Sequence, residues 1–253
     1  MADTPASIAC EDGIVIAYHH NPGYAPGVLF CGGFRSDMNG GKATSLNAFC
    51  HNRGQQYTRF DYRGHGQSSG VFADSTVGDW LNDAVTILDS VTTGPQIVVG
   101  SSMGGWIAFL LARTRPNRIA AIVTIAPAVD MTQRTLANLP NEAKRQLEEN
   151  GVWMRPSEYE PDGYPITQKL LDEGAVHILL NDPIPFKGPV RILHAMQDDV
   201  VPWSLSLDIL DALVSKDVEI TFVKDGDHRM SEPDGIKRLV NLVGAIPKKL
   251  PIG

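Results

Sequence analysis

Cysteines, basic runs and long apolar runs are all scarce in this chain of 253 residues, and each scarcity excludes a class of protein. The three scattered cysteines, Cys10, Cys31 and Cys50, are too few for a disulfide framework or a zinc site, so we expect reduced thiols. The formal net charge is −7 and no Lys/Arg-rich run occurs, which argues against nucleic acid as a partner. No apolar stretch approaches the roughly eighteen residues of a membrane span.

Features of a targeting segment are also missing from the first residues. Met1–Pro5 has neither the basic and apolar regions of a signal peptide nor an Arg-rich transit character. Together with the reduced cysteines, this predicts a cytoplasmic location. The length suits one large α/β domain, and we predict a single domain over residues 1–253.

Short apolar, β-branched runs alternate with segments of helical periodicity through most of the chain. We predict strands at 14–18, 28–31, 57–60, 97–99, 119–125, 190–194 and 218–223. We predict helices at 43–50, 80–88, 141–150, 169–180, 205–214 and 236–243, and one more that begins near residue 104. This alternation predicts a mostly parallel, doubly wound sheet whose ligand site lies beyond the carboxyl ends of the strands.

One segment, residues 131–187, departs from this pattern. It holds a charged helical stretch at 141–150 and is interrupted by Pro156, Pro161 and Pro165. A segment of this length is too long for a loop inside a compact domain. We therefore predict a small helical cap, inserted within the single domain, that covers the strand ends.

The most informative stretch is Gln96–Trp106. An apolar β-branched run leads into Gly100-Ser-Ser-Met-Gly104, which matches G-x-S-x-G, and an Ala/Leu-rich helical segment follows. Strand, sharp turn and helix are the required context of a nucleophile elbow, which holds the serine Oγ at the tip of a strained turn. We therefore predict Ser102 as a nucleophile; the alternative is a glycine-rich βα turn without a catalytic role.

A serine hydroxyl needs a base to take its proton, and three histidines follow Ser102 in the chain. His177 lies in the predicted cap, and His194 ends a predicted strand, where a structural role suffices. His228 lies in a loop after the last predicted strand, where the general base of such enzymes belongs. We predict His228 as the base; the alternative is an ordinary surface histidine.

The acid that orients this histidine should follow the preceding strand. His194–Pro202 offers two adjacent candidates, Asp198 and Asp199. The pattern His-Gly-x-x-Asp-x-x-Val-Pro, usual in hydrolases with this elbow, places Asp198 in register, with Ala195 in place of the glycine. We predict Asp198 as the acid and keep Asp199 as the alternative.

Acyl transfer also needs donors for a developing oxyanion. The backbone N–H of Met103, directly after the nucleophile, is one predicted donor, and the N–H of Phe34 after Gly32-Gly33 is the other. The alternative for the glycine pair is a tight turn.

Two further sets of residues have less specific patterns. In the stretch Asp61–Ser68, we assign Asp61 and Arg63 a structural role, and we expect His65 to support the site rather than act as a base. Each of three tryptophans either lines an acyl pocket or packs in the core: Trp106, Trp153 and Trp203.

Taken in this order, the elbow, the Asp198 motif and His228 resemble the α/β-hydrolases. Further motifs resemble one subfamily, which contains the mitochondrial palmitoyl-protein thioesterase that also acts as an acyl-glucuronide esterase. They are Asp37–Lys42, Phe60–Tyr62, Val77–Trp80, Gly94–Ile97, Gly100–Trp106, Leu193–Met196, Val201–Trp203 and Asp227–Met230. Two short motifs in the predicted cap, Gly151–Trp153 and Pro156-Ser157, also match. The resemblance extends from about Gly27 to Arg238. Because no transit peptide is evident, the chain resembles a bacterial relative of that subfamily.

The resemblance implies an α/β-hydrolase fold, the triad Ser102, Asp198 and His228, and hydrolysis of acyl esters or thioesters. We expect a cofactor-free and metal-free serine hydrolase that acts on a small-molecule acyl ester or thioester, or on an acylated protein. A general carboxylesterase for small esters is the nearest alternative, and a non-catalytic ligand-binding relative is the alternative outside enzymes. The sequence leaves the natural acyl group and the oligomeric state open.

Overall fold

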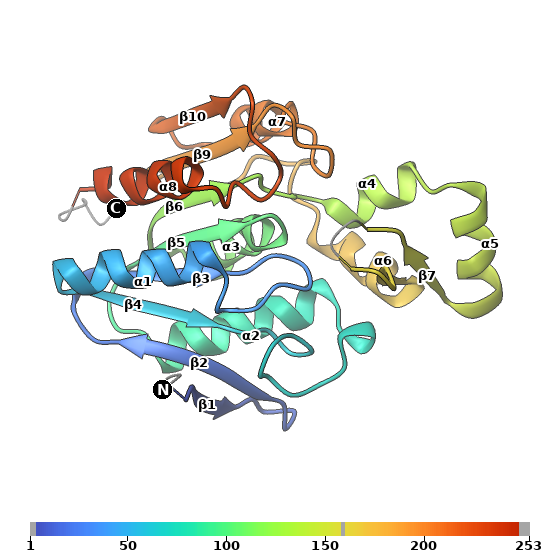
Figure 1. Cartoon of the computed structure of the whole chain (residues 1–253), viewed down its shortest axis with the longest axis horizontal. Coiled ribbons are helices and arrows are strands. Elements are labelled where there is room, and N and C mark those ends of the chain that lie inside the picture. The colour runs from blue at the N-terminus through green and yellow to red at the C-terminus, as the bar shows by residue number, and fades with distance from the viewer. Residues whose placement is uncertain (1–3, 158–159, 248–253) are drawn as a thin grey trace.

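A mixed sheet of eight strands forms the centre of the molecule (Figure 1). The computed structural model describes residues 4–157 and 160–247, so both ends of the predicted domain lie outside the described residues. The strand order is β1-β2-β4-β3-β5-β6-β9-β10. The strands are β1 (Ala6–Ala9), β2 (Val15–Asn21), β3 (Tyr24–Cys31), β4 (Gln55–Phe60), β5 (Gln96–Ser101), β6 (Ile119–Ile125), β9 (Val190–Ala195) and β10 (Val218–Val223).

Six of these strands, β4, β3, β5, β6, β9 and β10, run parallel to one another, as the alternating pattern predicts. β2 is antiparallel to both of its neighbours, β1 and β4, so the edge strand β1 runs in the same direction as the six. In Figure 1 the arrows of the parallel strands point to the same side of the molecule. Their carboxyl ends therefore share one edge, where ligand sites of doubly wound sheets lie.

Helices cover both faces of the sheet because successive strand residues point to opposite sides. On β5, Val98 packs into the core beneath α2 and α3, whereas Ile97 and Val99 pack into the core beneath α1 and α8. All three side chains are buried. The helices of this part are α1 (Gly41–Arg53), α2 (Val77–Ser90), α3 (Met103–Thr114), α7 (Leu205–Ala212) and α8 (Pro233–Ala245), with 3₁₀ turns at Phe72–Asp74 and Pro116–Arg118.

Between β6 and β9 the chain leaves the sheet and forms a small layer of its own. It comprises α4 (Met131–Ala137), α5 (Asn141–Asn150), β7 (Val152–Arg155), β8 (Tyr164–Thr167), α6 (Gln168–Gly174) and a 3₁₀ turn at Ala175–His177. β7 and β8 pair with each other as a two-stranded antiparallel sheet. Figure 1 shows α4, α5, α6 and β7 beyond the side to which the parallel strands point. We refer to residues 131–187 as the cap segment.

One carboxylate ties the start of the cap segment to its later part. Asp130, just after β6, accepts hydrogen bonds from the backbone N–H groups of Leu179 and Leu180, each at 2.9 Å. Asp130 is buried, and this burial raises the pKa of its carboxyl group although the two N–H groups oppose the shift. The residue that precedes α4 is thus tied to the stretch that follows the 3₁₀ turn Ala175–His177.

Several elements differ from the predictions. The strand β1, the helix α4 and the β7–β8 hairpin were not predicted, and the predicted helix 169–180 ends at Gly174. Gly174 packs so closely on Thr132 of α4 that a Cβ would collide with that side chain. The close packing of α6 on α4 requires glycine at the point where α6 ends. Among the described residues, no helix combines the length and apolarity needed to cross a bilayer.

Candidate active site

Ser102 occupies the sharp turn between β5 and α3. Its backbone angles, φ +54° and ψ −117°, lie in a region that non-glycine residues rarely adopt. The turn is held by three backbone hydrogen bonds: Ser102 N–H donates to Ile125 O (2.8 Å), and Ser102 O accepts from Gly105 N–H (2.9 Å) and Ala128 N–H (3.0 Å). A strained residue that its surroundings hold this firmly is typical of a functional site.

Two glycines allow the strand and the helix to approach at this turn. A Cβ on Gly100 would collide with the backbone carbonyl of Gly104. A Cβ on Gly104 would collide with the carbonyl oxygens of Cys31 and Gly32 at the end of β3. Only glycine fits at these two positions, and the close approach keeps Ser102 beside the turn that follows β3.

Three side chains predicted from separate motifs come together here. The Oγ of Ser102 lies 3.1 Å from Nε2 of His228, and Nδ1 of His228 lies 2.7 Å from Oδ2 of Asp198. They come from the elbow, the loop after β10 and the loop after β9. The geometry matches a nucleophile, its base and the carboxylate that orients the base.

The structure places Asp198 rather than Asp199 against His228. The Asp198 side chain is 0% exposed, and its Oδ1 accepts hydrogen bonds from the N–H groups of Val200 (2.9 Å) and Val201 (2.8 Å). Burial favours the neutral acid, but hydrogen bonds from His194 and His228 outweigh it and hold the pKa of Asp198 well below its usual value. Asp199 is exposed and lines a cavity beside the site.

His194 also contacts Asp198, a contact that the sequence analysis did not foresee. Its Nε2 lies 3.2 Å from Asp198 Oδ2 and 3.1 Å from Val201 O, and its Nδ1 lies 2.7 Å from Ser206 Oγ. The His194 side chain is 0% exposed. The spacing of four residues between His194 and Asp198 is the one sequence signal that could have indicated this pair.

The turn after β3 packs against the elbow. A Cβ on Gly33 would stand 3.4 Å from Ser101 O and 3.5 Å from the Ser102 Cβ. Within residues 4–157 and 160–247, neither the Phe34 N–H nor the Met103 N–H donates a hydrogen bond to another group. Two backbone donors near Ser102 are therefore available to a ligand.

The residues around this turn fix its position. Arg35 has a positive φ of 59°, and its N–H donates to His65 Nε2 (3.1 Å), while His65 Nδ1 lies 3.0 Å from Arg63 O. Burial lowers the pKa of His65 to about 4, so the ring is neutral at pH 7 and Nε2 remains an acceptor. Asp61 accepts hydrogen bonds from Met38 N–H (2.6 Å) and Gln67 N–H (2.8 Å). His65 and Asp61 thus hold the loops beside the site.

Lys42, in the first turn of α1, fastens the loop that carries His228. Its Nζ donates to Arg229 O at 2.5 Å and lies 3.4 Å from Ser231 Oγ. Burial, with a smaller contribution from the positive charge of Arg229, lowers the pKa of Lys42 to about 8. This role has no local sequence pattern because it depends on the contact between α1 and a loop far along the chain.

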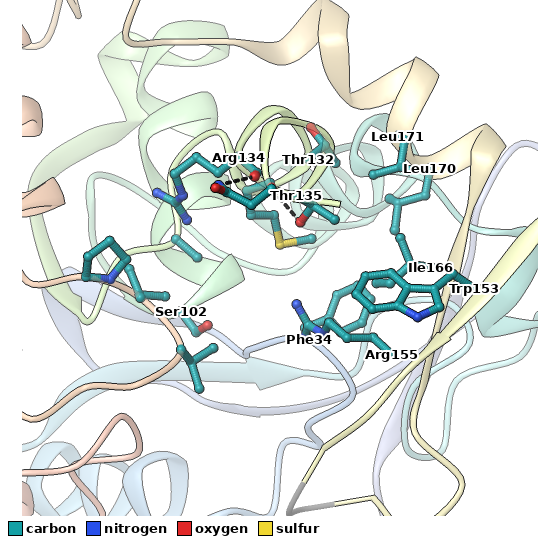
Figure 2. A pocket seen from close by; sticks show the side chains of 16 residues that line it. Phe34, Ser102, Thr132, Arg134, Thr135, Trp153, Arg155, Ile166, Leu170 and Leu171 are labelled. Atoms are coloured by element: carbon teal, nitrogen blue, oxygen red, sulfur yellow. Dashed lines mark hydrogen bonds between the residues drawn. The ribbon is translucent and has the colours of Figure 1, made fainter. Parts of the chain in front are cut away.

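Two cavities meet at Ser102. The first has a volume of about 310 Å³ and lies under the cap segment (Figure 2). Its apolar wall includes Phe34, Trp153, Ile166, Leu170 and Leu171, and its polar lining includes Thr132, Arg134, Thr135, Asn138 and Arg155. This volume is at the lower end of small-molecule sites.

Of the three tryptophans considered, Trp153 lines this cavity. Trp106 is fully buried in the core, where its Nε1 donates to His177 O at 3.2 Å. Trp203 packs edge-on against Phe222, with ring centroids 5.2 Å apart. The structure thus separates one cavity residue from two packing residues.

The second cavity has a volume of about 750 Å³ and also reaches Ser102. His228 lines this cavity and not the first one. Four cationic side chains, Arg35, Lys42, Arg155 and Arg229, and two anionic ones, Asp37 and Asp199, also line it.

Comparisons with known proteins agree with this fold. A family model described as serine aminopeptidase, S33, matches residues 28–171. The mitochondrial palmitoyl-protein thioesterase ABHD10 of Bos taurus is 44% identical over 236 residues, which span 93% of this chain and 77% of the relative. The Homo sapiens protein of the same name is 40% identical over the same shares.

Solved structures of similar proteins have the same fold. The mouse α/β-hydrolase domain-containing protein 10 is 40% identical, with a TM-score of 0.89 over 96% of this chain and 97% of that chain. A hydrolase from Agrobacterium vitis S4 is 35% identical, with a TM-score of 0.92 over 96% of this chain and 98% of that chain. The chain is therefore a hydrolase that belongs to the α/β-hydrolase family, in the group of the ABHD10 proteins.

Proposed function

We propose that this hydrolase cleaves carboxylic thioesters or esters through an acyl-enzyme formed on Ser102. The observation that carries the proposal is the line of contacts from Ser102 Oγ to His228 Nε2 (3.1 Å) and from His228 Nδ1 to Asp198 (2.7 Å) at a strained elbow. The name of the ABHD10 relatives, palmitoyl-protein thioesterase, favours thioesters of acyl groups as the first substrate class to test.

In the first half of the reaction, Ser102 Oγ attacks the acyl carbonyl and His228 Nε2 takes the hydroxyl proton. Asp198 stabilises the resulting imidazolium, and it remains ionised because its pKa is held low. The N–H groups of Met103 and Phe34 donate hydrogen bonds to the carbonyl oxygen as negative charge develops on it. The bond to the leaving group then breaks, and the departing sulfur or oxygen receives the proton from His228.

In the second half, water attacks the acyl-enzyme carbonyl while His228 takes a proton from the water. Collapse of this second tetrahedral intermediate releases the carboxylic acid and returns the proton to Ser102 Oγ. Every proton movement passes through Nε2 of His228. The side of Ser102 on which His228 lies is therefore the side of the leaving group and of the attacking water.

The two cavities thus receive different halves of the substrate. The cavity that His228 lines receives the leaving group, and the cavity under the cap segment receives the acyl group. Each methylene buried against Phe34, Trp153, Leu170 or Leu171 contributes about 0.8 kcal/mol. Four extra carbons should therefore raise kcat/KM by up to about two orders of magnitude, and less where the chain stays partly hydrated.

A fluorophosphonate probe tests the nucleophile directly. The wild-type protein and the control Ser101→Ala, which removes the neighbouring hydroxyl, should be labelled, whereas Ser102→Ala should not. Labelling of all three proteins would contradict the assignment of Ser102. Absence of labelling in the wild type, with no turnover of activated esters, would favour a non-catalytic ligand-binding protein.

A substrate panel tests the substrate class. Acetyl, butyryl, hexanoyl and octanoyl groups should each be joined to a thiol and to an alcohol, and kcat/KM measured for every member. We expect kcat/KM to rise with acyl length to about hexanoyl and to be higher for the thioesters, which have the better leaving group. A steady fall from acetyl to octanoyl would instead favour a carboxylesterase for small esters.

A further inference from the structure

A second buried histidine, His194 at the end of β9, lies against the carboxylate of Asp198. Its Nε2 stands 3.2 Å from Asp198 Oδ2, the same oxygen that lies 2.7 Å from Nδ1 of His228. On the far side of the ring, Nδ1 of His194 lies 2.7 Å from Oγ of Ser206 on α7. The contacts therefore form one line that runs from Ser206 through His194, Asp198 and His228 to Ser102.

The groups around His194 decide where its ring hydrogen lies. Nε2 faces two acceptors, Asp198 Oδ2 and Val201 O at 3.1 Å, so Nε2 carries a hydrogen. Nδ1 faces the hydroxyl of Ser206, which has no other hydrogen-bond partner in the part of the chain that the structure describes. The tautomer with its hydrogen on Nε2 satisfies both nitrogens, because His194 then donates to Asp198 and accepts from Ser206.

With His194 in place, the acceptor positions of the Asp198 carboxylate are all filled. Oδ1 accepts the N–H groups of Val200 and Val201, and Oδ2 accepts the N–H groups of the two imidazole rings. A carboxylate offers about four such positions, two on each oxygen. Two donors on each oxygen prevent the carboxylate from turning, so Oδ2 stays directed at His228. They also divide the negative charge of Oδ2 between two rings.

His194 has no access to the substrate. Its side chain is 0% exposed, and it lines neither of the cavities that meet at Ser102. Ser206, its partner on α7, is also fully buried. Any effect of His194 on the reaction therefore passes through Asp198. Burial strengthens that effect, because a hydrogen bond is electrostatically stronger in the protein interior than in water.

We propose that His194 is a positioning residue of the reaction: it fixes Asp198 Oδ2 in line with His228 and, by sharing the charge of that oxygen, keeps His228 less basic than an unshared carboxylate would make it. This inference rests on the proposed function, because it takes His228 as the general base. Without the N–H of His194, Asp198 can turn away from His228, which slows the chemical step. The undivided charge of Asp198 also stabilises the imidazolium more strongly, which raises the pH at which the base becomes active.

The pH dependence of kcat and kcat/KM on an activated ester tests the proposal. The proteins are the wild type, His194→Leu, His194→Gln and the control His20→Leu. Leucine removes both ring nitrogens, whereas glutamine places an amide N–H near the position of Nε2. His20 lies on β2, which β4 and β3 separate from β5, and its Nδ1 lies 2.9 Å from Thr58 Oγ1. The control therefore removes a histidine–hydroxyl contact at a distance from Ser102.

Other ionisable groups near Asp198 and His228 are the same in all of these proteins. They are Lys42 on α1, Arg134 on α4, Asp199 beside the triad acid, and Asp227 and Arg229 on the loop of His228. Because none of them is replaced, their influence on the profile cancels when a variant is compared with the wild type.

His194→Leu should lower kcat by about 10- to 100-fold with KM nearly unchanged, because a hydrogen bond to a charged group is lost away from the substrate. The acid limb of its kcat/KM profile should move upward by about half a pH unit to one unit. His194→Gln should recover most of the lost kcat and bring the limb back toward its wild-type position. His20→Leu should match the wild type in both measurements.

Two further variants show whether the effect passes along the line of contacts. In an Asp198→Asn background, His194→Leu should lower kcat by less than about threefold, because the charge on which it acts is already gone. Ser206→Ala should move the acid limb in the same direction as His194→Leu but by less, because a hydroxyl that donates to Nδ1 makes the Nε2–H a stronger donor.

Three results would overturn the proposal. One is an equal loss of kcat in His194→Leu and His194→Gln with an unmoved acid limb, which would show a purely structural role. The others are a loss that appears mainly in KM, and the same fold-loss in the wild-type and Asp198→Asn backgrounds. If urea unfolding shows that His194→Leu does not fold, Ser206→Ala decides: a raised limb supports the proposal and an unmoved limb overturns it. Failure of the proposed function would be recognised separately, because the wild type would then escape fluorophosphonate labelling.

Discussion

The neutral state of His65 should make a measurable contribution to the pH dependence of stability. His65 is 4% exposed, and its Nε2 accepts the N–H of Arg35 next to the turn that carries Phe34. Burial lowers its pKa from 6.5 to about 4, so the folded protein binds the proton less tightly than the unfolded chain does. The stability that this residue contributes is complete above pH 6.5 and is lost as the pH falls toward 4.

The size of this pH dependence of stability follows from how far burial lowers the pKa of His65. The difference between 6.5 and about 4 corresponds to about 3 kcal/mol of unfolding free energy once the pH is below both pKa values. Between about pH 7.5 and about pH 5 the same linkage gives a loss of about 2 kcal/mol. The variant His65→Gln keeps a hydrogen-bond acceptor and a donor but does not titrate, so it should lack this part of the loss.

Urea unfolding of both proteins at these two pH values measures the difference. Other titrating groups are common to the two proteins and cancel when one pH dependence is subtracted from the other. The wild type should lose about 2 kcal/mol more than His65→Gln on acidification. Parallel losses in the two proteins would refute the reasoning, because they would mean that the unfolded and folded chains protonate His65 alike.

Three further changes test the site and its support. Asp198→Asn should reduce kcat by about 10³- to 10⁴-fold and Asp199→Asn by less than about threefold in activated-ester assays; the reverse order would mean that Asp199 orients the base. Gly104→Ala should yield unfolded protein, or protein destabilised by more than about 3 kcal/mol in urea, because the new Cβ would collide with two backbone carbonyls. The control Gly41→Ala should fold normally, because its Cβ would contact only a side chain at 3.6 Å. Lys42→Met should lower kcat by about tenfold with little change in KM, because it removes the hydrogen bond that holds the loop of His228. An unchanged kcat would exclude this positioning role.

The residues that meet at Ser102 were predictable because each belongs to a local pattern. Ser102 follows from the glycines that its turn requires, Asp198 from its register with Val201 and Pro202, and His228 from its place after the last strand. Parallel strands end at one edge of a sheet, so residues that follow different strands meet there without any long-range sequence signal. The same rule predicted most of the parallel sheet.

The residues that shape the cavities were not predictable in this way. Arg155 lies in a proline-interrupted segment, and Pro165, which pairs with Met154 in the cap hairpin, is a residue that argues against a strand. Whether a tryptophan lines a cavity depends on how the cap segment lies over the sheet, and that arrangement has no local pattern. Lys42 acquires its role only when α1 packs beside the loop that carries His228.

The carboxylate of Asp130 has a consequence for how enzymes of this kind diverge. Because it accepts hydrogen bonds from the N–H groups of both Leu179 and Leu180, Asp130 joins the two ends of most of the cap segment at a single seam. We expect that a gene fragment encoding a different cap, exchanged at this seam, leaves the strand ends that carry the reactive groups in place. Selection, or an engineer assembling chimeras, can thus alter which acyl groups are accepted without rebuilding the machinery that cleaves them.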